Sequence, residues 1–105
     1  MMRIIVERIE GKVIYYRTKY GFSKGIWAEN TLPVVNQEYL VELDIDEVFE
    51  KNLNIFEEKK AEYNMYLNED GIVLIGQLEN IYDDGCACLR IGESMTLIST
   101  IIDKL

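Results

Sequence analysis

Residues 39–45 place their side chains on two different faces, and this pattern limits the folds open to the chain more than any other feature. One face would carry only apolar side chains: Tyr39, Val41, Leu43 and Ile45. The other face would carry Leu40, Glu42 and Asp44. A period of two is that of a β-strand with one buried side. The segment is therefore predicted to be a strand.

Turn signals divide the rest of the chain at hairpin spacing. Gly11 lies between predicted strands at 3–9 and 13–20, and the Asn68–Gly71 turn separates strands at 62–67 and 72–81. Gly76, inside the last of these strands, is expected to mark a bulge or a close backbone approach.

Weaker signals complete the reading. Residues 26–28 are predicted to form a short strand, and residues 30–37, which hold the only proline, a loop. Turns at 83–85 and 92–93 precede strands at 86–91 and 95–102. Asp46 is suited to cap a short helical turn that runs to Lys51.

These elements predict one fold class. The chain of 105 residues is expected to be a single β-rich domain, residues 1–105, with 49% hydrophobic residues to supply a core. Six to eight short strands are typical of a small antiparallel barrel or sandwich. We expect an oligonucleotide-binding-like or SH3-like architecture with at most one short helix.

Charge is distributed unevenly along the chain. The formal net charge is −8, but residues 1–28 carry +4 and residues 29–105 carry −12. Ordinary solvation explains part of this excess, since net charge keeps proteins soluble. An acidic face that meets a basic partner explains the unevenness better, because complementary charge steers association.

The acidic surface has candidate contact residues. Leu40 and Phe49 are candidate apolar anchors, because an interface needs a desolvated centre within its charged rim. The carboxylates expected to contact the partner are Glu42, Asp44, Asp46, Glu47 and Glu50, followed by Asp83 and Asp84.

Catalytic patterns are missing from the sequence. The chain has no histidine, the usual side chain for proton transfer near neutral pH. Cys86 and Cys88 cannot supply four zinc ligands, and no glycine-rich phosphate loop is present. We expect no enzymatic activity, no metal and no cofactor; both cysteines are interpreted as small apolar residues kept reduced.

An alternative function remains open. Aromatic and basic residues alternate near the N-terminus, and such mixtures on small barrels hold single-stranded nucleic acid by stacking and charge. The residues involved would be Tyr16, Arg17, Lys19, Tyr20 and Trp27. The net charge of −8 opposes binding to polyanions. A structural or adaptor domain is a third interpretation.

The passages 39–46 and 71–79, in a short, acidic, histidine-free β domain, resemble the immunity proteins of bacterial contact-dependent and polymorphic toxin systems. The resemblance implies a cytoplasmic protein that blocks a cognate toxin, often a basic nuclease. It carries over no residue roles. The short apolar run at residues 4–6 and the lack of any long apolar segment agree with a cytoplasmic location and no membrane partner. A homodimer through exposed strand edges stays open.

Overall fold

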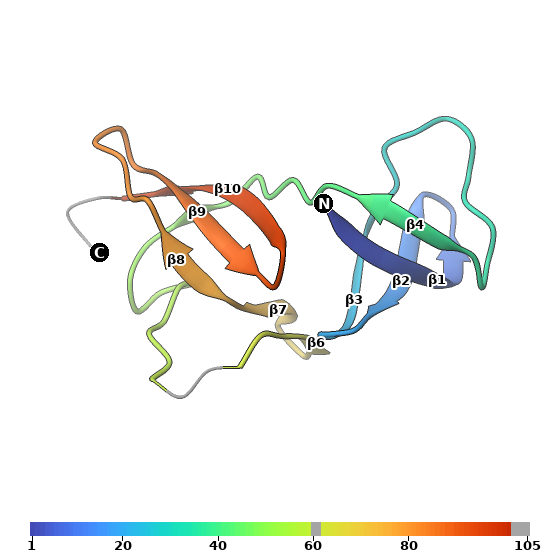
Figure 1. Ribbon diagram of the computed structural model, residues 1–105, viewed down its shortest axis with the longest axis horizontal. Coiled ribbons are helices and arrows are strands. Elements are labelled where there is room, and N and C mark those ends of the chain that lie inside the picture. Colours follow the sequence, from blue (N-terminus) through green and yellow to red (C-terminus); the bar gives the residue numbers. More distant parts are fainter. Residues whose placement is uncertain (60–61, 102–105) are drawn as a thin grey trace.

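The chain forms ten strands in two curled sheets in the computed structural model, which describes residues 1–59 and 62–101 (Figure 1). No helix occurs in that part of the chain. The prediction of a mostly-β fold, built as a small barrel or sandwich, is confirmed. Ile102, at the end of the strand predicted at 95–102, lies outside the described residues.

The first sheet has six strands in the order β4-β1-β2-β3-β6-β7. The three strands at its N-terminal end form a continuous antiparallel meander, with Glu7 as an extra residue at a bulge in β1. One parallel contact, between Gly21 and Met65, joins this meander to the β6–β7 hairpin. The strands are β1 (Met2–Glu10), β2 (Val13–Thr18), β3 (Gly21–Ile26), β4 (Glu38–Val41), β6 (Asn64–Asn68) and β7 (Gly71–Ile75).

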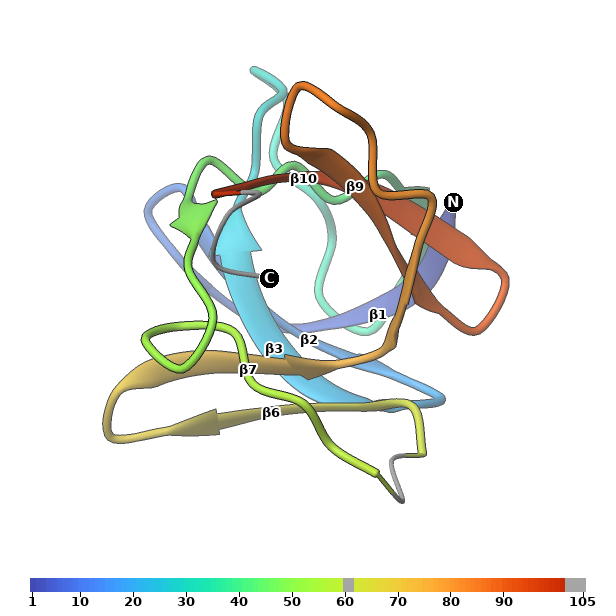
Figure 2. The same cartoon turned by 90° about the vertical axis from the view of Figure 1, so that its left-hand side faces the viewer.

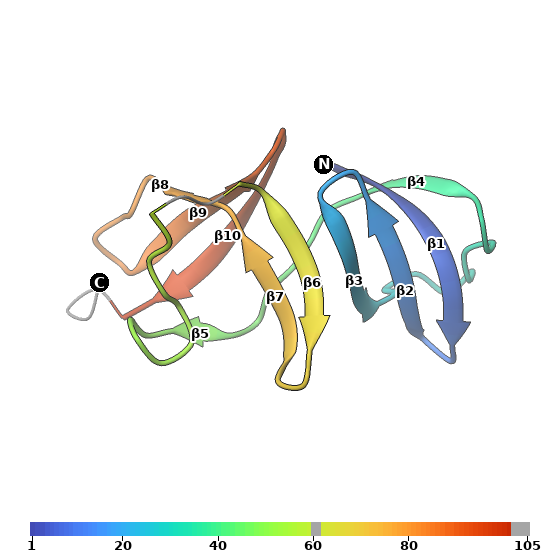
Figure 3. The same cartoon turned by 90° about the horizontal axis from the view of Figure 1, so that it is seen from below.

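The second sheet has four strands in the order β5-β10-β9-β8. Its centre is the antiparallel hairpin of β9 and β10, and β5 runs parallel to β10. Figure 3 shows the two sheets side by side, with β6 and β7 lying between β3 and the second sheet. The strands are β5 (Val48–Phe49), β8 (Gln77–Glu79), β9 (Cys86–Ile91) and β10 (Ser94–Thr100).

Gly76 marks the point where one extended segment passes from the first sheet to the second. It separates β7 from β8. A Cβ atom at this position would lie 2.3 Å from the carbonyl oxygen of Arg90, which is far inside van der Waals contact. The predicted close approach is confirmed, and its physical role is to let the chain bend against β9.

A single apolar cluster links the two sheets. Its first-sheet members include Ile4 and Val6, which are almost fully buried, and Ile91 joins it from β9. Figure 2 shows β9 and β10 on the opposite side of this interior from β6 and β7. Burial of these side chains is the main force that holds the sheets together.

A contact between two turns closes the junction. The Tyr20 hydroxyl, after β2, donates a hydrogen bond of 2.6 Å to the Glu93 carboxylate in the β9–β10 turn. Tyr20 lies directly over Gly92, whose φ of 62° and lack of a Cβ atom allow this approach.

The strand predicted at residues 39–45 is only partly correct. Backbone pairing with β1 ends at Val41, although Leu43 and Ile45 remain half-buried and Glu42 and Asp44 exposed. The side chains alternate because one side of the segment faces the core. Backbone pairing stops at Val41 because β1, its partner strand, begins at Met2, opposite Val41. The helical turn predicted from Asp46 is wrong, because β5 forms there and pairs with β10.

Strand β3 was not predicted at its true position. The sequence suggested a strand at 26–28, whereas β3 spans Gly21–Ile26. Glycine is depleted in strands, and here two glycines obscured the pattern. Gly21 is required because a Cβ atom would overlap the Met65 carbonyl oxygen, and its φ is 141°.

Candidate functional site

The first group of predicted carboxylates lies on the segment that crosses from β4 to β5. Glu42, Asp44, Asp46 and Glu47 are all exposed on this connection, whereas Leu43 packs against the core. Figure 1 shows the segment passing from the first sheet to the second. The carboxylates at its start therefore lie near the first sheet, and those at its end lie beside the second.

The second group, Asp83 and Asp84, lies close to the end of this segment. Val48 pairs with Ser99, and Ser99 pairs with Cys86 across the sheet. With about 4.8 Å between neighbouring strands, the Cys86 backbone is about 10 Å from Val48. The fold thus brings Glu47, beside Val48, near the turn that holds the two aspartates.

Hydrogen bonds hold both turns that carry these carboxylates, one at residues 82–86 and the other at residues 50–54. The Thr100 hydroxyl and amide donate to the Gly85 carbonyl at 2.6 and 2.7 Å, and Asp84 Oδ1 accepts from the Cys86 amide at 3.0 Å. At the other turn, the Glu50 amide donates to Asn54 Oδ1 at 2.8 Å. A surface fixed in this way loses little conformational entropy when it binds.

The two apolar residues predicted as anchors lie elsewhere. Leu40 is exposed on the first sheet, where it pairs with Arg3. Phe49 is half-buried and pairs with the buried Thr100, so it faces inward. Neither side chain occupies the centre of the outer face of the second sheet.

That centre is occupied by residues that the sequence reading did not single out. In β10, Met95 and Leu97 face outward and are 44% and 64% exposed, whereas Thr96, between them, is only 7% exposed. Val48, 58% exposed, pairs with Ser99 on the same outward side. The alternation in 95–102 was visible in the sequence, but alternation alone does not tell which side faces the core.

The charges around this face lack cationic partners. None of the seven predicted carboxylates makes an ion pair with a described residue. The one arginine of the second sheet, Arg90, is already bound to Glu79 at 2.9 Å, which raises the pKa of its guanidinium. The outer surface of the second sheet therefore combines exposed apolar side chains with uncompensated negative charge.

The thiol of Cys86 is poorly suited to nucleophilic chemistry. The nearby Asp84 carboxylate, and partial burial, raise the pKa of the Cys86 thiol above its usual value. A raised pKa depletes the thiolate, which is the reactive form. Both cysteines are free, and within residues 1–59 and 62–101 no group of three acidic or cysteine side chains is placed to hold a metal ion.

The residues considered for nucleic acid are not gathered on one open surface. Tyr16 lies in the core, where burial raises the pKa of its phenol. Trp27 packs edge-on against Tyr39, and its indole donates to the Thr31 carbonyl at 2.8 Å. Two stacking positions are thus already engaged within the fold.

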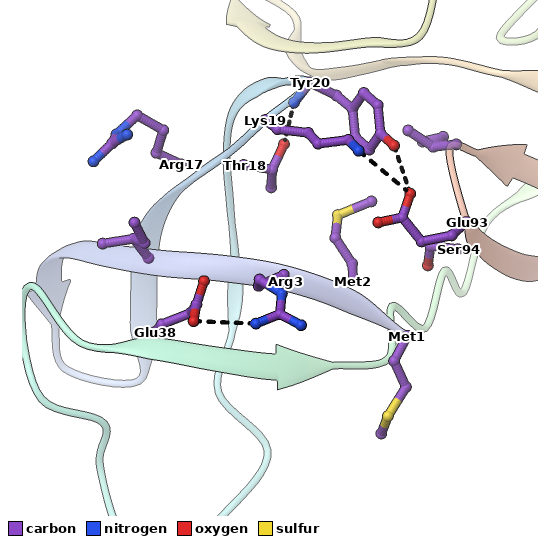
Figure 4. Close-up of a pocket in the computed structure, with 12 residues that line it drawn as sticks. Met1, Met2, Arg3, Arg17, Thr18, Lys19, Tyr20, Glu38, Glu93 and Ser94 are labelled. Atoms are coloured by element: carbon purple, nitrogen blue, oxygen red, sulfur yellow. Dashed lines mark hydrogen bonds and ion pairs between the residues drawn. The ribbon is translucent and has the colours of Figure 1, made fainter.

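The remaining three, Arg17, Lys19 and Tyr20, line a pocket of about 320 Å³ at the junction of the sheets (Figure 4). Lys19 approaches the Glu93 carboxylate at 3.9 Å, and Arg17 approaches Glu7 at 3.8 Å. Figure 4 shows the Arg17 head group pointing away from the Tyr20–Glu93 contact. The cations of this pocket are therefore already neutralised by carboxylates.

Comparison with known proteins finds a partial match to an enzyme. The chain is 36% identical over 70 residues to the argininosuccinate lyase of Methanococcus aeolicus; the match includes 63% of this chain and 14% of that enzyme. No family model matches the chain, and no solved structure matches it. Within the described residues, no helix is long and apolar enough to cross a membrane.

Proposed function

We propose that this chain is a non-catalytic binding protein that inhibits a basic protein partner by covering it with the outer surface of the second sheet. The surface consists of Val48, Met95 and Leu97, with Glu47, Glu50, Asp83 and Asp84 at its rim. We name these residues the acidic apolar surface.

The orientation of β10 is the observation that carries this proposal. Ser94, Thr96, Ile98 and Thr100 of this strand face the interior, whereas Met95, Leu97 and Ser99 face solvent. Burying large apolar side chains is worth more than burying small polar ones, yet Met95 and Leu97 stay exposed while three small polar side chains of the same strand are buried. Exposed apolar groups rimmed by polar ones mark interaction sites.

The charges support a basic partner. The rim carboxylates have no cationic neighbour among the described residues that would neutralise them, so a cationic partner gains their full attraction. Tyr82, 51% exposed beside Asp83, adds an aromatic side chain of the type enriched in interface centres.

The partner class rests on the resemblance of the sequence to immunity proteins. An acidic protein that occludes a basic toxin, such as a nuclease domain, would act in the cytoplasm of the cell that makes both. The segment shared with an argininosuccinate lyase adds no substrate to this proposal, because it represents 14% of that enzyme.

The proposal is tested by affinity capture from the native lysate over a salt series. The wild-type chain is compared with the double variant Glu47→Lys/Asp83→Lys, whose two carboxylates are exposed and accept no side-chain hydrogen bond in the described structure. A matched control, Glu29→Lys/Glu69→Lys, changes the net charge equally, at exposed positions outside the second sheet.

We expect the wild-type chain and the control to capture the same basic protein, and the Glu47/Asp83 variant to bind it at least about tenfold more weakly, or about 1.4 kcal/mol. Equal loss in both double variants would indicate a nonspecific charge effect. Recovery of nucleic acid would favour the alternative function, and recovery of nothing would favour a structural domain.

A further inference from the structure

The outer face of the meander formed by β1, β2 and β3 carries aromatic and basic side chains. Tyr16 and Ser23 of this meander are buried in the core. Because side chains alternate along a strand, Tyr15, Phe22 and Lys24 point to the opposite, outer side. Phe22 is 37% exposed, and the other two are half-buried. The sequence reading chose Tyr16 for stacking, which is one residue away from the tyrosine on the outer face.

The strand register places these side chains next to one another. Tyr15 pairs with Arg8 on one side and with Lys24 on the other. In the next row of the same face, Phe22 pairs with Arg17. The centroids of the Tyr15 and Phe22 rings are 6.4 Å apart, and the ring planes differ by 28°. The Arg8 guanidinium lies over the Tyr15 ring, 4.0 Å from its centroid. Two flat groups therefore lie side by side, the Phe22 ring and the guanidinium over Tyr15.

The charges of this face are locally positive. Arg8 approaches Glu10 at 3.4 Å, and both side chains are exposed. Arg17 approaches Glu7 at 3.8 Å, also at the surface. Exposed pairs of this kind contribute little to stability, so a phosphate group can compete with either carboxylate. Lys24 makes no ion pair with a described residue. Three cations thus meet two carboxylates on the outer face.

The excess negative charge of the chain lies elsewhere. Residues 1–28 carry +4. The rim carboxylates of the acidic apolar surface lie beside β5 and in the turn before β9, at the opposite end of a molecule that is 42 Å long (Figure 3). At physiological ionic strength, exposed charges are screened over about 8 Å. An anion at the meander is therefore influenced mainly by the local cations.

From this arrangement we infer that the outer face of the meander binds single-stranded nucleic acid. Phe22 and the Arg8 guanidinium each stack on a base, and Arg17 and Lys24 contact phosphates. An open sheet face suits an extended strand, whereas small molecules need a concave site. The bases of a duplex are already stacked on one another, so the face favours a single strand. The acidic apolar surface lies on the other sheet, and the inference does not depend on it.

The inference is tested by the fluorescence anisotropy of a labelled single strand of random sequence, titrated with the full chain at low and at physiological salt. The matching duplex is titrated in parallel. We expect tighter binding of the single strand. Phe22→Leu keeps an apolar side chain but removes the ring, and it should weaken binding at least about fivefold. Phe56→Leu is the matched control, at a position outside the meander that is 66% exposed, and it should leave binding unchanged.

A pair of lysine variants tests the contribution of charge. Lys24→Gln should weaken binding and make it less dependent on salt, by about one released counterion. Lys51→Gln changes the net charge equally at an exposed position next to β5, and it should alter neither quantity. Failure to bind the single strand at low salt would overturn the inference. Equal affinity for the duplex or for polyglutamate would also overturn it, because charge alone would then explain the binding.

Discussion

The outer faces of the two sheets are built from similar residues but are balanced differently. On the first sheet, Arg3 and Arg8 each meet a carboxylate, at 3.3 and 3.4 Å. Around the second sheet, the carboxylates at 47, 50, 83 and 84 meet no described cation. Within the net charge of −8, the arginines of the first sheet and the Arg90–Glu79 pair of the second are compensated, whereas the carboxylates at the rim of the second sheet are not. The difference teaches that the position of charge, more than its total, distinguishes the two sheets, and the proposed binding surface is based on it.

The two sheets are compared as parts of one folded unit, and they are joined where Gly76 packs against β9. A substitution at Gly76 is therefore expected to have the largest effect. Gly76→Val should destabilise the fold by more than about 3 kcal/mol, because its Cβ atom would overlap the Arg90 carbonyl. Gly25→Ala is the control, since its Cβ atom would meet only Tyr16 at 3.9 Å. Urea unfolding followed by Trp27 fluorescence and by circular dichroism measures both variants. Normal stability of Gly76→Val would contradict the described crossing.

Neutralising one carboxylate on each sheet should have opposite effects. Glu38→Gln removes the ion pair with Arg3 and should lower the free energy of unfolding by about 0.5 kcal/mol or less. Glu47→Gln removes a charge that has no described partner, and it should leave stability unchanged or raise it slightly. Denaturant titration at low ionic strength measures both. Equal destabilisation by the two variants would break the comparison.

The smallest expected effect is at the contact between the turns. The hydrogen bond from Tyr20 lowers the pKa of Glu93, so its contribution is present at neutral pH and is lost as pH falls through that lowered pKa. The same bond raises the pKa of Tyr20, so the contribution is also lost in strong alkali, as pH rises through that raised pKa. Tyr20→Phe should slightly lower the midpoint of thermal unfolding near pH 7, but not below the pKa of Glu93. A deficit that is independent of pH would indicate lost packing instead.

Much of the fold was readable from the sequence because hairpins are local. The turns at Gly11 and at Asp70-Gly71, and the close approach at Gly76, each follow from a few neighbouring residues. The parallel pairing of β5 with β10 joins residues about fifty positions apart, and two residues of β5 carry no recognisable pattern. Such pairing depends on tertiary packing, which a local pattern does not contain.

The candidate site was predictable only in its charge. The rim carboxylates could be identified because the acidic residues cluster in the sequence, whereas Leu97 and Val48 required knowledge of which side of the sheet faces the core. In β10, the alternation is equally strong for either orientation, and the structure turns Met95 outward and Thr96 inward. Leu40 lies apart from these residues because the strand that carries it belongs to the other sheet.

The most direct test of the acidic apolar surface is amide hydrogen exchange of the chain with and without the basic protein that it captures. The account predicts slowed exchange in two segments, Val48–Glu50 and Tyr82–Cys86, together with the exposed edge of their sheet. It predicts little change in β2 and β3. Protection confined to the first sheet, with none in those two segments, would contradict the account.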